Sequence, residues 1–343
     1  MPILATQPMR LEGREIITEE NIETKYPSEC RPILKPGVLL IPILNCPYMD
    51  PASCDDDWKA SNSHLQILES AEKGNYGVIA AIAYNIEQII GLVRAAEKAR
   101  SPLILQFFPW AITFSDGLLI RTASDAAKRA KVPVSVHLDH AQDEDMIKNA
   151  ADNLPFDSIM VDMSHFEKEE NLSKTRKWVK YCHDRQIATE AEPGRIEGGE
   201  DGVIDTVGLE ASKTTPEEVD QFIATGVDVL APAFGNVHGK YGTQGPQLDF
   251  DRISQIKRQL DGRTWIALHG TNGFSADLMR ACIKAGATKI NVNRLVLDDY
   301  YDYVAAHAGA QKSHTKLLEE SVNKVVNQTM QWMEIVGSAG KAT

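Results

Sequence analysis

The 343-residue chain is 43% hydrophobic and 24% charged, which are the proportions of ordinary globular proteins and exclude disorder as its main state. Its formal net charge of −12 disfavours nucleic acid and anionic membranes as partners, because both attract clustered Lys and Arg. No stretch approaches the ~18 apolar residues of a membrane span, and Met1-Pro2-Ile3 does not begin a secretory signal, so we expect a cytoplasmic protein.

The first part of the chain, residues 1 to about 60, is rich in proline and contains the acidic triplet 55–57. Proline removes backbone donors and fixes the backbone dihedral φ, so regular structure is hard to sustain there. We therefore predict two parts: an irregular N-terminal arm over 1–60, packed on one larger domain over 61–343.

From Ser61 onward, short β-rich runs alternate with amphipathic helical patterns. The eight candidate strands are 77–84, 102–108, 134–140, 157–163, 187–192, 228–234, 265–269 and 289–293. The helical patterns include 63–73, 86–99, 116–130, 171–185, 215–225, 250–260 and 275–285, and 295–307 and 316–336 follow the last strand. Eight βα units in succession predict an α/β fold, a closed (β/α)₈ barrel with an extra C-terminal helix.

Polar side chains gather directly after the predicted strands, where a (β/α)₈ barrel builds its active site. His140, His238 and His269 follow three different strands. Imidazole suits zinc, and a catalytic zinc ion usually has three protein ligands, so we predict that these residues hold one divalent metal ion. Of the other histidines, His64, His183, His307 and His314 are expected away from the site, and His137 and His165 are expected near it but are left unassigned.

Six separated segments resemble the class II, zinc-dependent fructose-bisphosphate and tagatose-bisphosphate aldolases. They are 132–140, 156–165, 190–194, 198–201, 236–241 and 268–270, and 84–88 and 289–293 extend the match. The segments follow the family's order and spacing over about 61–336. The resemblance implies a divergent family member that reversibly cleaves a ketose bisphosphate, such as fructose 1,6-bisphosphate, to dihydroxyacetone phosphate and an aldehyde.

The resemblance also assigns roles to single residues. A metal ion held by the three histidines would stabilise the enediolate oxygen as charge develops. Asp139 would exchange the hydroxyl proton with a pKa raised by its surroundings, or alternatively orient a ligand. Glu200, in a Gly-rich loop, would exchange the proton on the nucleophilic carbon. Asp162 and Glu192 would be alternative metal ligands or would support the ligands.

A phosphate site, and often a monovalent cation (Na⁺ or K⁺), are further implications of the resemblance. Gly239 and Gly270 directly follow two of the histidines, and their lack of side chains lets backbone N–H groups approach a phosphate. Asn291 matches a family residue that touches the substrate. Family members are dimers or tetramers, so we expect a homodimer or homotetramer.

Three positions differ from the family and leave the substrate open. Phe108 replaces a hydroxyl residue, Asn272 replaces a serine, and Arg294, next to Asn293, replaces a threonine. The favoured interpretation is a phosphorylated ketose, bound by Asn272, Asn293, Arg294 and the glycine amides, because Arg binds phosphate through two hydrogen bonds. The alternatives are a less phosphorylated hydroxyketone, bound beside Phe108, and a metal-free barrel acting as a binding protein.

Overall fold

The computed structural model describes residues 58–199, 212–309 and 313–342, so the predicted arm lies outside the described residues up to position 57. Eight parallel strands each pair with the next, and the last closes on the first. They are β1 (Val78–Ile82), β2 (Leu103–Phe107), β3 (Val134–Ala141), β4 (Ser158–Val161), β5 (Ala188–Ala191), β6 (Val229–Leu230), β7 (Trp265–Leu268) and β8 (Lys289–Val292). The predicted (β/α)₈ barrel is confirmed.

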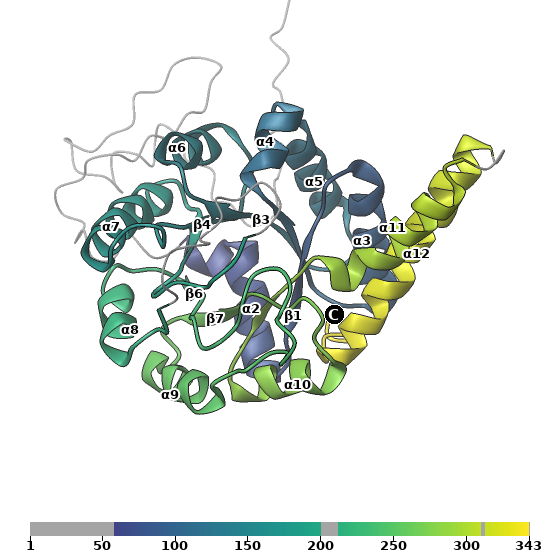
Figure 1. Ribbon diagram of the computed structural model, residues 1–343. Coiled ribbons are helices and arrows are strands. Elements are labelled where there is room, and N and C mark those ends of the chain that lie inside the picture. Colours follow the sequence, from purple (N-terminus) through teal and green to yellow (C-terminus); the bar gives the residue numbers. More distant parts are fainter. Residues whose placement is uncertain (1–57, 200–211, 310–312, 343) are drawn as a thin grey trace, which may run out of the picture. The chain divides into compact units, whose positions relative to one another are not determined.

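Helices surround the barrel as a ring (Figure 1). They are α2 (Ser63–Gly74), α3 (Ile86–Ala99), α4 (Pro109–Ser115), α5 (Leu118–Arg129), α6 (Glu144–Asn153), α7 (Lys168–His183), α8 (Pro216–Ile223), α9 (Phe250–Leu260), α10 (Ala276–Ala285), α11 (Arg294–His307) and α12 (His314–Ile335), with a short 3₁₀ turn, η3 (Lys59–Ser61), before α2. The extra C-terminal helix is confirmed as α12, which packs on α3 and α11. No helix in the described ranges is both long and apolar enough to cross a bilayer.

The helical and strand patterns differ from the structure in a few places. Helices α4 and α6 were not among the predicted patterns. Strand β6 ends at Leu230, earlier than predicted, because Ala233 exchanges two hydrogen bonds of 2.8 Å with Thr214 instead of continuing the ladder. The chain beyond β6 is thereby turned into a loop at the rim of the barrel.

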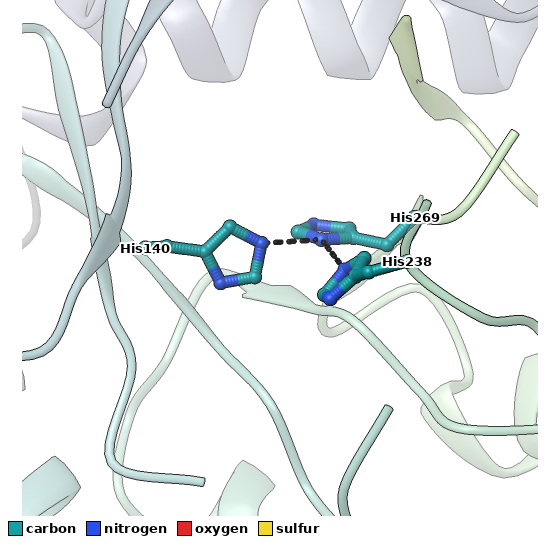
Figure 2. A group of neighbouring side chains, drawn as sticks. All are labelled: His140, His238 and His269. Atoms are coloured by element: carbon teal, nitrogen blue, oxygen red, sulfur yellow. Dashed lines mark hydrogen bonds between the residues drawn. The ribbon is translucent and has the colours of Figure 1, made fainter. Parts of the chain in front are cut away.

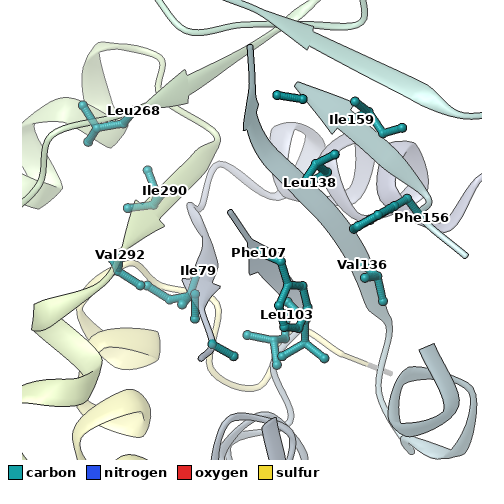
Figure 3. Packing of buried hydrophobic residues seen from close by; sticks show 14 of the residues in the cluster. Ile79, Leu103, Phe107, Val136, Leu138, Phe156, Ile159, Leu268, Ile290 and Val292 are labelled. Atoms are coloured by element: carbon teal, nitrogen blue, oxygen red, sulfur yellow. The ribbon is translucent and has the colours of Figure 1, made fainter. Parts of the chain in front are cut away.

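The main core lies between the outward faces of the strands and the surrounding helices. Figure 3 shows Ile79, Val136, Ile159 and Ile290 from four different strands in this layer. These side chains alternate with inward-facing ones, as the twofold period of a strand requires. The layer fixes each strand and so fixes which residues face the interior of the barrel.

Helix α2 closes one end of the barrel interior. Its Ile67 and Leu68 pack on Val78, Ile104 and Met160, and all five side chains are at most 2% exposed. Burial on this scale stabilises the closed end by roughly 1.5–3 kcal/mol for each large apolar side chain. A site reached from solvent must therefore open at the other end, where the strands finish.

The inward positions towards the open end are polar. Ser135 and His137 on β3, Glu190 on β5 and Lys289 on β8 have no exposed surface, and Asp139 is 2% exposed. Barrel interiors are usually filled by branched apolar side chains, and buried polar groups cost free energy unless they are paired. This polar layer therefore marks the functional end of the barrel.

Candidate active site

A distortion of β3 turns two consecutive side chains towards the open end. Alternation along a regular strand would place Asp139 and His140 on opposite faces. Instead, the pairing of β3 with β4 shifts between Leu138 and Ala141, and His140 adopts a left-handed φ of 49°. Such a conformation costs about 1–3 kcal/mol and is found mainly at functional sites. It places both Asp139 and His140 at the lining of one cavity.

The three predicted histidines meet in that cavity (Figure 2). His140 Nε2 lies 3.1 Å from His269 Nδ1, and His238 Nε2 lies 3.4 Å from the same atom. Nitrogens bound tetrahedrally to a zinc ion at ~2.0–2.1 Å lie about 3.4 Å apart. The side chains are buried, with exposures from 1% to 8%. Their spacing fits one divalent ion.

The protons on two of these rings are positioned by carboxylates. His140 Nδ1 donates to Asp162 Oδ2 at 2.8 Å, and His269 Nε2 donates to Glu190 Oε1 at 2.8 Å. When both rings are neutral, each turns a nitrogen with a free lone pair towards the other, and a proton or a metal ion must lie between the two nitrogens. Carboxylate-supported imidazoles are the usual arrangement around metal ions.

The charges around His140 also favour a cation. Burial alone would lower its pKa, but the carboxylates of Asp139 and Asp162 outweigh burial and raise the pKa of His140 to about 10. Burial, with His140 and His269 nearby, lowers the pKa of His238 well below its usual value. The cavity thus combines negative potential with neutral imidazole nitrogen, as a metal site requires.

Asp139 is held by an amide on each of two sides. Gln106 Nε2 donates to its Oδ2 at 2.8 Å, and Asn291 Nδ2 lies 3.3 Å from the same oxygen. Burial raises the pKa of Asp139, but His140, a hydrogen bond with His137 and the charge of Lys289 together bring it well below the usual value. The predicted rise in this pKa is therefore wrong. Asp139 is therefore ionised, and its lowered pKa makes it a weaker base than an ordinary carboxylate.

Asp162 and Glu192 differ in what they do in the structure. Besides His140, Asp162 accepts hydrogen bonds from Ser164 N at 3.1 Å and Ser164 Oγ at 2.6 Å. Glu192 accepts from Ile196 N at 2.6 Å, and burial and the nearby Asp162 raise its pKa well above normal. Asp162 therefore contacts His140 and Ser164 through both of its oxygens, whereas Glu192 has a carboxylate oxygen within 4.8 Å of ligand atoms of His140 and Asp162.

The loops after β6 and β7 are tied to each other. Tyr241 Oη donates to Gly270 O at 2.7 Å and accepts from Val237 N at 3.1 Å. Asn236 Nδ2 donates to His269 O at 3.2 Å. These bonds set the separation of His238 and His269 through the backbone.

Substituting Gly270 is expected to disturb the site far more than substituting Gly273. Both have positive φ, 71° and 74°, so alanine strains the backbone at each. A Cβ on Gly270 would lie 2.4 Å from Val237 O, whereas one on Gly273 would meet nothing within 4 Å. We predict that Gly270→Ala lowers aldol-cleavage activity at least about tenfold, while Gly273→Ala changes it less than about threefold. Equal losses in both variants would contradict this account of the loops.

Of the histidines predicted to lie away from the site, His183 does so, whereas His64 lies inside the barrel next to His137. His183 pairs with Asp228 at 2.8 Å, outside the cavity lining. His64 is fully buried under the polar layer and stacks on His137, with ring centroids 5.3 Å apart. His165 packs on Phe166 at 4.1 Å between ring centroids.

The loop that carries Glu200 begins next to His238. Glu200 itself lies outside the described residues. Three residues earlier, Glu197 O accepts a hydrogen bond of 2.8 Å from His238 N. The start of this loop is thus attached to one of the three histidines.

The three positions that depart from the family pattern lie around the same cavity. Phe108 is 3% exposed, and its ring centroid lies 6.3 Å from that of His140. Arg294, at the start of α11, pairs with Asp298 and lies 5.1 Å from the centroid of the Tyr301 ring. Asn293 donates to Tyr84 Oη at 2.8 Å. The cavity therefore has an aromatic side and a side with one cationic group.

A family model described as fructose-bisphosphate aldolase class-II matches residues 62–341. The chain belongs to this family. It is therefore a carbon–carbon lyase, which removes the non-enzymatic alternative. The aldolase is similar to a Coccidioides immitis (strain RS) protein provisionally named fructose-bisphosphate aldolase, with 49% identity over 289 residues, 82% of this chain and 95% of that protein.

Solved structures agree with this membership. A crystal structure from Coccidioides immitis, described provisionally as a fructose-1,6-bisphosphate aldolase, matches the aldolase with a TM-score of 0.80 and 50% identity over 82% of this chain and 98% of that one. The YdjI aldolase from Escherichia coli K12 matches with a TM-score of 0.71 and 28% identity over 81% and 98% of the two chains.

Sequence reasoning missed Glu190 and Lys289 as residues of the aldolase's site. Both lie in segments that carry the family resemblance, 190–194 and 289–293, but neither was given a role of its own. Glu190 Oε1 contacts His269 Nε2 at 2.8 Å, and Lys289 Nζ lies 3.0 Å from Glu190 Oε2. A signal was present, because an ionisable side chain in an otherwise buried strand needs a partner.

Proposed function

We propose that this aldolase is metal-dependent and that His140, His238 and His269 hold its ion, with zinc as the favoured metal. The observation that carries the proposal is the convergence of three imidazole nitrogens, with His140 Nε2 3.1 Å and His238 Nε2 3.4 Å from His269 Nδ1. The outer nitrogens of His140 and His269 are held by the carboxylates of Asp162 and Glu190. The same ligands accept other divalent ions, so the ligand set favours zinc without requiring it.

Held by these three histidines, a divalent ion would supply positive charge that lowers the energy of the carbanion left when the carbon–carbon bond breaks. We assign Asp139 as the base that takes the proton from the hydroxyl group that becomes the aldehyde. Its oxygens are oriented by Gln106 and Asn291. The electron pair of the broken bond stays on the other fragment, where Glu200 is proposed to deliver a proton to carbon.

We propose a phosphorylated ketose as the substrate, with fructose 1,6-bisphosphate as the first compound to test. Gly239, Gly270, Asn272 and Arg294 line the cavity around the histidines. Backbone N–H groups at such glycines, with a guanidinium, form an anion site. Thr271 is not part of this proposal, because its hydroxyl donates to Asn291 O at 2.6 Å.

A second candidate substrate, a less phosphorylated hydroxyketone, is favoured by two contacts. Phe108 occupies the wall beside His140 where relatives have a hydroxyl. Arg294 is paired with Asp298, so binding a phosphate must displace or share that carboxylate. Both observations reduce the capacity for anions on their sides of the cavity.

The two candidates are separated by chelator-sensitive cleavage of fructose 1,6-bisphosphate, tagatose 1,6-bisphosphate and an unphosphorylated ketose. We expect kcat/KM for a bisphosphate to exceed that for the unphosphorylated ketose at least about 100-fold, because each lost charge-assisted bond is worth roughly 1.5–3 kcal/mol. Arg294→Ala should raise KM for the bisphosphate and leave the unphosphorylated ketose unchanged. Equal turnover of phosphorylated and unphosphorylated ketoses would contradict the proposal that the substrate is a phosphorylated ketose.

The homodimer or homotetramer, the monovalent cation and the cytoplasmic location remain predictions. Asn293 likewise remains a predicted substrate contact, and its amide nitrogen is already bonded to Tyr84. Sedimentation measurements would test the oligomeric state directly.

A further inference from the structure

A buried ion pair crosses the interior of the barrel beneath the three histidines. Lys289 on β8 and Glu190 on β5 have no exposed surface, and Lys289 Nζ lies 3.0 Å from Glu190 Oε2. Neither residue lines the cavity. Removing two charges from water costs several kcal/mol per ion, and apolar replacements of similar volume are often at least as stable. Stability alone is therefore a weak reason for this pair.

Glu190 connects the pair to a proposed metal ligand. Its Oε1 accepts the proton of His269 Nε2 at 2.8 Å, while its Oε2 faces Lys289. A carboxylate paired with an ammonium group can only accept hydrogen bonds. Glu190 therefore holds His269 on its Nε2 side and leaves Nδ1 facing the cavity.

Lys289 also sets the orientation of Asn291. An ammonium group has only donors, so Asn291 must turn its Oδ1 towards Lys289 Nζ, at 2.7 Å. The amide nitrogen of Asn291 then points the other way, 3.1 Å from His269 Nε2 and 3.3 Å from Asp139 Oδ2. With the opposite amide orientation, two donors would face each other at Lys289 and two acceptors at Asp139.

A third observation shows why a positive charge is needed there. Ligand atoms of His137, Asp139 and Glu190 lie within 4.8 Å of one another. Two carboxylates at that separation repel in a region without water. The Lys289 ammonium lies beside Glu190 in this group and offsets the repulsion.

We propose that Lys289 is a positioning residue for the proposed metal site, acting through Glu190 on His269 and through Asn291 on Asp139. It touches neither the proposed ligand atoms nor the cavity. The inference rests on the proposed metal-dependent function. It predicts that uncharging the pair lowers metal affinity while the barrel stays folded.

The test is the double variant Lys289→Met/Glu190→Gln, which leaves no lone buried charge and so avoids the main reason for misfolding. Zinc affinity is measured by competition with a chromophoric chelator, and folding by circular dichroism and thermal unfolding. Removing the hydrogen-bond partner of a metal-bound histidine typically lowers metal affinity 10–100-fold. We expect the zinc affinity of the double variant to fall by about that factor. A matched control is Lys257→Met/Glu72→Gln, which removes the ion pair between α9 and α2 and should leave zinc affinity unchanged within about twofold.

The outcomes distinguish a failure of the proposed metal-dependent function from a failure of the proposed role of Lys289. If the parent protein binds no divalent metal, the proposed function fails. If the parent binds zinc and the folded double variant binds it as tightly, the positioning role of Lys289 is wrong and the pair is only structural. A single Glu190→Gln variant provides a second measurement: with zinc saturating, its kcat should exceed that of the double variant, because Lys289 still orients Asn291. Equal kcat values would show that Lys289 does not act on Asp139 through Asn291.

Discussion

Replacing His140 by alanine should abolish both tight divalent-metal binding and aldol cleavage. His140 supplies one of the three converging nitrogens, and its left-handed backbone and its hydrogen bond to Asp162 hold that ring in place. Removing a ligand from a three-ligand site leaves the metal weakly bound. Loss of an ion that contributes several kcal/mol to transition-state stabilisation lowers kcat/KM at least about 1000-fold. Metal content after dialysis and steady-state kinetics measure the two effects.

The matched control is His183→Ala, which removes a histidine that is also paired with a carboxylate, Asp228, but outside the cavity. This variant should keep the parent's metal content and its kcat/KM within about threefold. A His140→Ala protein that retained stoichiometric metal and most of its activity would contradict the assignment of the ligands.

The second large effect is expected at Asp139. Asp139→Asn keeps the volume of the side chain and removes its ability to take up a proton. General acid–base groups contribute about 10²–10⁴-fold to rate, so kcat should fall by that factor. The three histidines are unchanged, so metal content should stay the same. The measurement is kcat at saturating ketose bisphosphate, with metal content determined on the same preparation.

Asp157→Asn is the control for Asp139→Asn, because it changes a half-buried carboxylate outside the cavity. Asp157 accepts a hydrogen bond from Val136 N at 2.8 Å near the closed end of the barrel. Its substitution should affect thermal unfolding and leave kcat unchanged. If Asp139→Asn instead lost its metal in proportion to its activity, Asp139 would be a support for the ligands and not the base.

Most of the fold was predictable because a barrel repeats one simple pattern. Each strand is a short apolar run, and in each helix apolar residues recur every three to four positions. The local sequence therefore indicates where both kinds of element lie. Helix α3 was predicted at its observed bounds, Ile86–Ala99. The short end of β6 was not predictable, since it depends on Thr214, which competes for the backbone of Ala233.

The site was predictable where it depends on strand ends and not where it depends on geometry across the barrel. His140, His238 and His269 each follow a strand, so barrel topology alone brings them together. The fixed tautomer of His269 depends on Glu190, a residue from another strand. The lowered pKa of Asp139 depends on its sequence neighbours His140 and His137, and also on Lys289 and His269 from other strands.

The most direct test of the metal-dependent mechanism is one titration. The purified aldolase is analysed for divalent metal, stripped with a chelator, and then titrated with zinc while cleavage of fructose 1,6-bisphosphate is followed. The account predicts loss of activity on stripping and full recovery at one zinc ion per chain. Undiminished cleavage by protein that contains no divalent metal would contradict it.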